Sequence, residues 1–222
     1  MKLVTFRNVS VLGVTPVAAK VPENAVQRLD SDLSRLQSCL ARAGHSAGGK
    51  FNVVIEPDDY APMQKATVFF DFANNRALIK ASKTSDSSAL LGEYMVSVLI
   101  PNGFPKPMSG QYQAVYYSLQ SYFPASCLNI AASPDTSTRW SETDNVMGWF
   151  HTYASILWEI RSRTGTNALD RALFQAWSAL QPSCQDPRFA SVFSAKVIAL
   201  LGKASGDQAA EVFRTMGLSP EN

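Results

Sequence analysis

The sequence predicts an α+β fold, with strands in the first part of the chain and helices in the second. Short β-branched and aromatic runs separated by turn residues extend to about residue 81, whereas from residue 146 apolar residues recur at helical spacing. Strands first and helices later are typical of the α+β class. We expect a single domain over residues 1–222, with an α+β sub-lobe over about 1–108 and a helical sub-lobe over 109–222.

The first part of the chain contains one amphipathic helix among its strands. Apolar residues alternate three and four apart between Pro22 and Ala43, which predicts a helix with one buried face that Gly44 ends. Strands are expected at Leu3–Val14 (one or two strands), Phe51–Glu56, Thr67–Phe72 and Arg76–Ala81. Asn74-Asn75 fits a tight turn between the last two strands, because asparagine tolerates the positive φ that such turns require.

A buried helix over Asp86–Ile100, DSSALLGEYMVSVLI, is expected at the centre of the fold. Asp86 fits an N-cap, and Pro101 cannot continue a helix. Apolar residues recur at helical spacing along this stretch: Leu90, Leu91, Tyr94, Met95 and Val98. Its Glu93 is of interest only together with segments further along the chain, because a lone glutamate on a helix is ordinarily solvated.

Helices are expected through most of the remaining chain. Gly110–Phe123 is predicted to form a second buried helix that Pro124 ends. A polar loop is expected over Ala131–Thr143. Four more helices are expected at about 146–163, 167–180, 186–202 and 206–216, because glycine and proline separate these periodic segments.

Composition argues against several classes of protein. The 222 residues carry a net charge of +2, and this near-neutral balance gives no sign of a nucleic-acid partner. The chain also has no phosphate-binding glycine loop. No stretch approaches the roughly 20 apolar residues that a membrane-spanning helix needs. The N-terminal run resembles a signal peptide only in part, because Asn8, Ser10 and Thr15 interrupt its apolar core.

The three cysteines cannot all pair within one chain. Cys39 lies on a predicted helix, and we expect it to be a small core residue. Cys127 and Cys184 both fall in predicted loops, which leaves a bridge between them open. No two cysteines have the spacing of a zinc site.

Four stretches follow one another in an order that matches a known group of enzymes. The first is Leu91–Val96, LGEYMV, where a zinc-binding helix would carry His-Glu-x-x-His. The others are Ala114–Phe123 (AVYYSLQSYF), Asp144–Arg161 (DNVMGWFHTYASILWEIR), and the segment from Gly165 through Ala168-Leu169-Asp170 and Ala176 to Gly217-Leu218. Over about residues 23–218 the chain thereby resembles the gluzincin zinc metallopeptidases, the thermolysin- and fungalysin-like enzymes.

The resemblance implies a zincin-like fold whose metal site has been lost. It assigns the zinc-ligand positions to Gly92, Val96 and Tyr117, the catalytic glutamate to Glu93, and a histidine that stabilises the transition state to Met147. Glycine and valine carry no ligand atom, and neutral tyrosine is a poor zinc ligand. Without zinc no bound water reaches a pKa near 7, so the resemblance implies no metal, no cofactor and no catalytic residue.

The same substitutions predict how the vestigial site is filled. Val96, Tyr117 and Met147 are expected to pack where a metal centre would have been. A buried carboxylate is costly unless it is neutralised or hydrogen-bonded. We therefore expect Glu93 to have a raised pKa or a hydrogen-bond partner, for which Tyr117 is a candidate.

We expect a catalytically inactive, metallopeptidase-like module that is structural or binds protein, as a subunit of a larger assembly. Because active members of the family are commonly extracytoplasmic, the resemblance favours a periplasmic or secreted protein. The alternative is an active hydrolase or peptidase with a non-standard metal or catalytic site that uses Glu93, His151 or Asp144. Two further interpretations remain open: an unrelated α+β domain, and a cysteine nucleophile pairing Cys127 with His151, although no local signature supports that pair. The second histidine, His45, is expected to be exposed.

Overall fold

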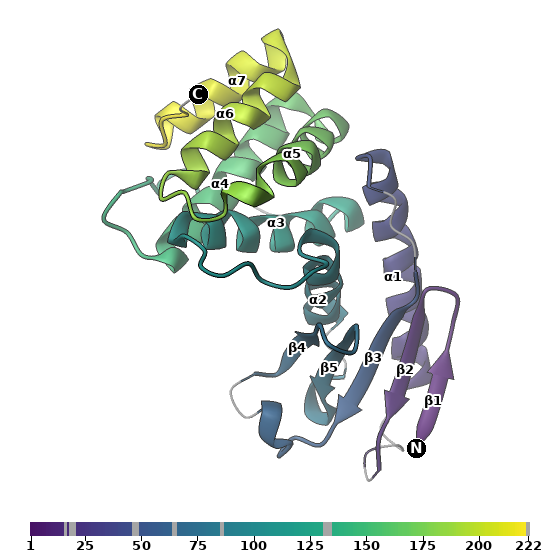
Figure 1. Cartoon of the computed structure of the whole chain (residues 1–222). Coiled ribbons are helices and arrows are strands. Elements are labelled where there is room, and N and C mark those ends of the chain that lie inside the picture. Colours follow the sequence, from purple (N-terminus) through teal and green to yellow (C-terminus); the bar gives the residue numbers. More distant parts are fainter. Residues whose placement is uncertain are drawn as a thin grey trace. The chain divides into compact units, whose positions relative to one another are not determined.

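The computed structural model describes residues 1–15, 17, 21–45, 49–63, 66–84, 87–130 and 135–220. The chain divides into two compact units, Met1–Ser38 with Ala47–Phe104, and Cys39–Ser46 with Pro105–Asn222. The described residues form five strands and seven α-helices, which confirms the α+β class (Figure 1). None of the helices in these ranges has the length and apolarity that a bilayer crossing demands, as expected.

The first unit is built on a five-stranded mixed sheet (Figure 1). Its strands are β1 (Lys2–Thr5), β2 (Val9–Gly13), β3 (Phe51–Glu56), β4 (Val68–Asp71) and β5 (Arg76–Lys80), in the spatial order β1-β2-β3-β5-β4. The three inner strands are parallel, and β1 and β4 pair antiparallel at the two edges. Asn75 has a φ of +48°, which confirms the tight turn between β4 and β5.

Two helices cover one face of this sheet, α1 (Glu23–Arg42) and α2 (Ser87–Leu99). Side chains alternate between the faces along each strand, so the odd-numbered apolar residues of the inner strands share one face. Phe51 on that face meets Tyr94 of α2 edge to face, with ring centroids 5.5 Å apart. On the opposite face Met63 packs with Val54 and Leu78. Both faces of the inner strands are therefore buried.

The second unit consists of helices around an aromatic core. They are α3 (Gly110–Leu128), α4 (Val146–Thr164), α5 (Thr166–Leu180), α6 (Phe189–Leu201) and α7 (Lys203–Thr215), with the last residues of α1. Fully buried Tyr112 of α3 lies 4.9 Å from the rings of both Trp177 and Phe189. Such aromatic contacts bury large areas and hold α3, α5 and α6 together.

The prediction that Pro124 ends the second buried helix is wrong, because α3 continues to Leu128. Proline removes one amide donor and strains the preceding turn, yet it does not forbid a helix whose later residues are held from outside. Ser126 and Cys127, in the turn after Pro124, are both bonded to other helices. The helix ends instead at Asn129, which has the left-handed conformation of a C-cap.

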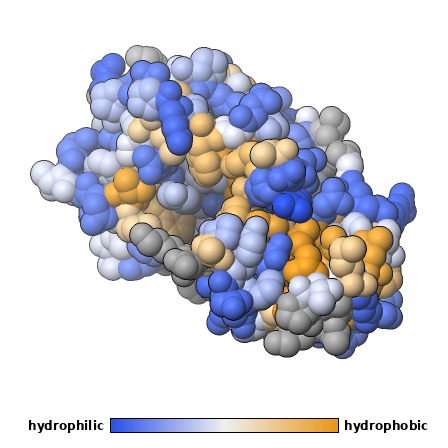
Figure 2. Space-filling model, turned by 60° about the horizontal axis from the view of Figure 1, so that its bottom comes forward, coloured by the Kyte–Doolittle hydropathy of each residue, from blue (hydrophilic) through white to orange (hydrophobic). Residues whose placement is uncertain are grey.

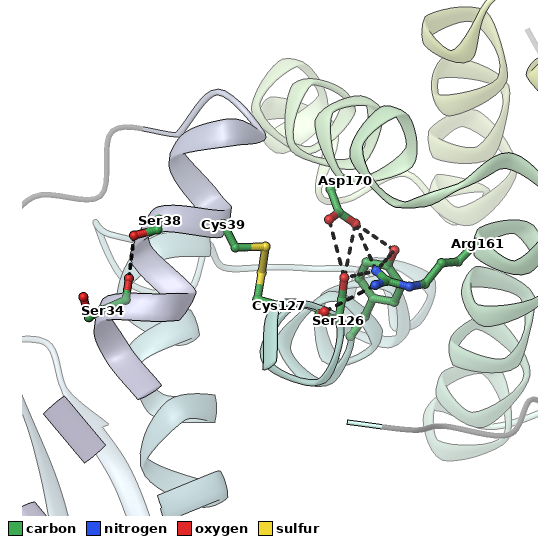
Figure 3. The surroundings of a disulfide bond; sticks show 8 residues. Ser34, Ser38, Cys39, Ser126, Cys127, Arg161 and Asp170 are labelled. Atoms are coloured by element: carbon green, nitrogen blue, oxygen red, sulfur yellow. Dashed lines mark hydrogen bonds and ion pairs between the residues drawn. A yellow bond between two sulfur atoms is a disulfide. The ribbon is translucent and has the colours of Figure 1, made fainter. Parts of the chain in front are cut away.

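The predictions for the cysteines also need correction. Cys39 is buried, as expected of a small core residue, but it forms a disulfide with Cys127, with Cα atoms 5.6 Å apart (Figure 3). The suggested bridge between Cys127 and Cys184 is therefore wrong, and Cys184 is a buried free thiol. The physical reason is the continuation of α3 past Pro124, which turns Cys127 from a loop residue into a helix residue facing the end of α1.

The disulfide predicts a thiol count and a stability effect. The non-reduced unfolded chain should show one reactive thiol, and three after reduction. A Cys39→Ser/Cys127→Ser variant should lose about 2–4 kcal/mol of unfolding free energy in urea, because the bridge closes a loop of 88 residues in the unfolded chain. Cys184→Ala, which leaves the bridge intact, is the matched control and should lose clearly less. Three reactive thiols before reduction would contradict the assignment.

Candidate functional site

The helix that carries the candidate site, α2, forms where the sequence predicts it. It spans Ser87–Leu99 and ends before Pro101, and the proposed N-cap Asp86 lies outside the described residues. Leu90, Leu91, Tyr94 and Met95 are buried as expected, whereas Val98 is half-buried. The apolar stripe therefore fixes how α2 packs and where Glu93 lies on its surface.

Glu93 is bonded to the edge strand β4. Its carboxylate accepts a hydrogen bond from the backbone N–H of Phe70. Burial raises the pKa of Glu93 to about 7, and the Phe70 amide acts in the opposite direction. The expected raised pKa is thus confirmed, and the partner in the structure is a backbone amide, where the sequence had suggested Tyr117.

The geometry of β4 explains why this amide is accessible to Glu93. The Lys80 N–H donates to the Thr67 carbonyl, 3.0 Å away, at the start of the pairing between β4 and β5. Hydrogen-bonded pairs alternate along an antiparallel ladder, so the N–H of Phe70 points away from β5. As β4 is an edge strand, this donor has no partner among the strands that the structure describes. Glu93 satisfies it from α2.

The neighbours of Glu93 on α2 offer no metal ligands. Val96 is buried, as the packing hypothesis requires, and neither it nor Gly92 has a side-chain donor atom. Across the described ranges no group of three or more His, Cys, Asp or Glu side chains is placed to hold a metal ion. The chemistry of the residues around Glu93 therefore does not fit a zinc centre.

The other two predicted site residues lie in the second unit, one half-buried and one exposed. Tyr117 of α3 is half-buried, with ring centroids 5.2 Å from Tyr116 and 6.4 Å from Phe150. Met147 lies in the first turn of α4 and is 54 % exposed. The expectation that Met147 fills a buried volume is wrong, because it follows the cap residue Asn145 at a helix start on the surface.

The residues proposed for other catalytic sites have other roles. Cys127 has no free thiol, so the pairing with His151 is excluded. His151 is exposed, with its ring centroid 4.8 Å from that of Phe150. His45 is half-buried rather than exposed, because its ring stacks on Phe174 at 5.3 Å, and burial lowers its pKa. The carboxylate of Asp144 accepts from the backbone N–H of Asn145, 3.0 Å away, beside the start of α4.

A buried ion-pair network links α3, α4 and α5, and sequence reasoning assigned no role to its members. Arg161 contacts Ser126 and lies 3.7 Å from the carboxylate of Asp170 (Figure 3). The Tyr122 hydroxyl donates to the same carboxylate at 2.8 Å, and the Arg161 guanidinium lies 5.3 Å from the Trp158 ring. Burial raises the pKa of Asp170, against the effects of Tyr122 and Arg161. The sequence carried no signal that singles them out, because α4 also contains Glu159 and Arg163 and α5 also contains Arg171.

In comparisons with known proteins, the chain matches no family model, no curated protein and no solved structure.

The ion-pair network predicts a strong dependence on Arg161. Arg161→Met should lower the unfolding free energy by about 3 kcal/mol in urea titrations, because it leaves the Asp170 carboxylate buried without its cation. Arg163→Met on the same helix is the matched control. Arg163 is more exposed and pairs with Glu159 on the surface, so its loss should be below about 1 kcal/mol. Equal losses in both variants would show that the network contributes no more than a surface pair.

Glu93 predicts a pH dependence of stability. Its folded pKa of about 7 exceeds the ordinary 4.5, so folding takes up a proton between these values. The stability it contributes is present at low pH and lost as the pH rises through about 7. Glu93→Gln should therefore be more stable than the unsubstituted chain by about 2 kcal/mol at pH 8. This is less than the whole pKa shift of Glu93 implies, because its carboxyl is partly solvated. The difference in unfolding free energy between the two chains, measured in urea titrations, should shrink toward pH 5. A difference that stays the same at every pH would contradict this prediction.

Proposed function

We propose that this chain is a catalytically inactive, metallopeptidase-like domain that serves as a structural or protein-binding module in a larger assembly. The observation that carries the proposal is the bond from Glu93 to the Phe70 amide. In an active zinc peptidase the corresponding carboxylate polarises a metal-bound water. Here Gly92 and Val96 offer no ligand, and the carboxylate is used to satisfy the backbone of an edge strand.

The order of elements supports the zincin-like part of the proposal. A helix, α1, and a small mixed sheet precede α2, and the helices of the second unit follow it. This is the arrangement that the resemblance to the gluzincins implies. One fold can host many functions, so the functional part of the proposal rests on Glu93 and its neighbours.

The same bond favours a subunit role over capture of an extended peptide on β4. A peptide that adds a strand to a sheet edge uses the outward amides of that edge. The outward amide of Phe70 is occupied by Glu93. Hydrophobic residues also reach the surface at several places (Figure 2). Large exposed apolar side chains include Leu3, Phe104 and Met147, which suits contacts with protein partners.

The disulfide supports an extracytoplasmic location within this proposal. Bonds such as Cys39–Cys127 persist in oxidising compartments and are rare where cellular thiols keep cysteines reduced. A periplasmic or secreted module agrees with the compartment that the resemblance favours.

One observation favours the alternative, an active hydrolase with a non-standard site. A partly buried carboxyl with a pKa of about 7 is suited to general acid–base work at neutral pH. The alternative requires a nucleophile or bound metal within reach of Glu93. It predicts activity that Glu93→Gln abolishes.

The proposal predicts the metal content and the activity of the purified chain. Protein prepared without chelator should contain no stoichiometric zinc, and a competitive zinc titration should find no tight site. Casein and short peptides should be cleaved no faster by the unsubstituted chain than by Glu93→Gln. One tightly bound zinc, or cleavage lost in Glu93→Gln, would overturn the inactive assignment, and His45, His151 and Cys184 would become the ligand candidates.

The module part of the proposal is tested on the same full chain recovered from its own cells. It should sediment as a complex with a partner in fixed stoichiometry, and dissociation should release the free chain. A monomer with no cross-linked partner would contradict a subunit role.

A further inference from the structure

The first unit contains a cavity that the fold does not fill. It has a volume of about 230 Å³ and lies between α1, the start of α2 and the face of the sheet that these helices cover. Its floor is wholly apolar and consists of Val11, Val53, Ile55 and Ile79, each at most 3 % exposed. Protein interiors are normally close-packed, so an apolar space of this size beside buried strands requires an explanation.

The mouth of the cavity is polar and carries a cationic side chain. Arg28 and Asp32, one turn apart on α1, line one side, and Thr84 and Ser87 line the other. Asp32 lies 3.8 Å from Arg35 and is thereby partly neutralised. Arg28 is exposed, and among the residues that the structure describes it has neither an ion pair nor a hydrogen bond. The mouth thus has an available guanidinium above an apolar interior.

We propose that this cavity binds a small amphipathic carboxylate, with its apolar body between α1 and the sheet and its carboxylate on Arg28. An apolar cavity of about 150 Å³ is known to hold benzene, so 230 Å³ accommodates a body of roughly six to eight carbon atoms. A guanidinium binds a carboxylate through two parallel hydrogen bonds. The Thr84 hydroxyl already donates to the Ala81 carbonyl, so Arg28 is the donor at the mouth to which we assign the carboxylate.

Three eight-carbon probes that differ only in the head group test the proposal on the full chain. Octanoate, octan-1-ol and octylamine are titrated by calorimetry and by NMR of the methyl groups of Val53, Ile55 and Ile79. Octanoate should bind at one saturable site and shift these methyl resonances. It should bind about fivefold more tightly than octanol, the gain expected for a partly exposed charge-assisted contact. Octylamine should bind more weakly than octanol.

Two substitutions separate the head group from the cavity. Arg28→Gln should reduce the advantage of octanoate over octanol to less than twofold, whereas Arg7→Gln, the same change at an exposed arginine outside the lining, should leave it unchanged. Ala25→Leu places a larger side chain in the cavity and should abolish binding of both probes while the chain stays folded. Absence of saturable methyl shifts, binding that survives Ala25→Leu, or preference for octylamine would each overturn the proposal.

Discussion

The ion pair between Arg161 and Asp170 is the interaction on which the second unit depends. Two charged groups at 14 % and 6 % side-chain exposure are tolerated only while each keeps its partners. Tyr122 and Ser126 supply the remaining hydrogen bonds from α3, and Trp158 covers the guanidinium. The network therefore fixes the relative positions of α3, α4 and α5 in a core that is otherwise made of aromatic and aliphatic contacts. Those contacts alone are less directional.

Two carboxylates of the molecule, buried Asp170 and partly buried Glu93, show how surroundings affect a charge state. Asp170 faces a cation and a hydroxyl, whereas Glu93 has one backbone amide. Burial raises the pKa of both carboxyls, but only Asp170 has a cation that acts against the rise. The pKa of Glu93 reaches about 7. A pKa near neutrality is why Glu93 supports both the inactive proposal and its alternative.

Most elements could be predicted from the sequence, because hydrophobic periodicity and turn residues act locally. β3 lies at Phe51–Glu56 as expected, and Asn75 forms its predicted turn. The errors share one cause, which is tertiary context. Pro124 ends a helix by its own chemistry, but the bonds of Ser126 and Cys127 keep α3 helical beyond it. That error displaced Cys127 into a loop and hid its pairing with Cys39. The hydrogen bond from the Phe70 amide to Glu93 could not be predicted, because every residue except proline has a backbone N–H and the sequence does not show which of them lacks a partner.

The position of the disulfide along the chain has a consequence for biosynthesis. A ribosome releases Cys39 with α1, and Cys127 follows 88 positions later in the chain. Strands β1 and β2 precede Cys39, and β3, β4 and β5 lie within that interval. Since domains generally fold as units during synthesis, the sheet can form while the Cys39 thiol is still unpaired. Cys184 emerges last of the three, when the correct partner of Cys39 is already present. The order of the cysteines thus favours the native pair over the wrong one.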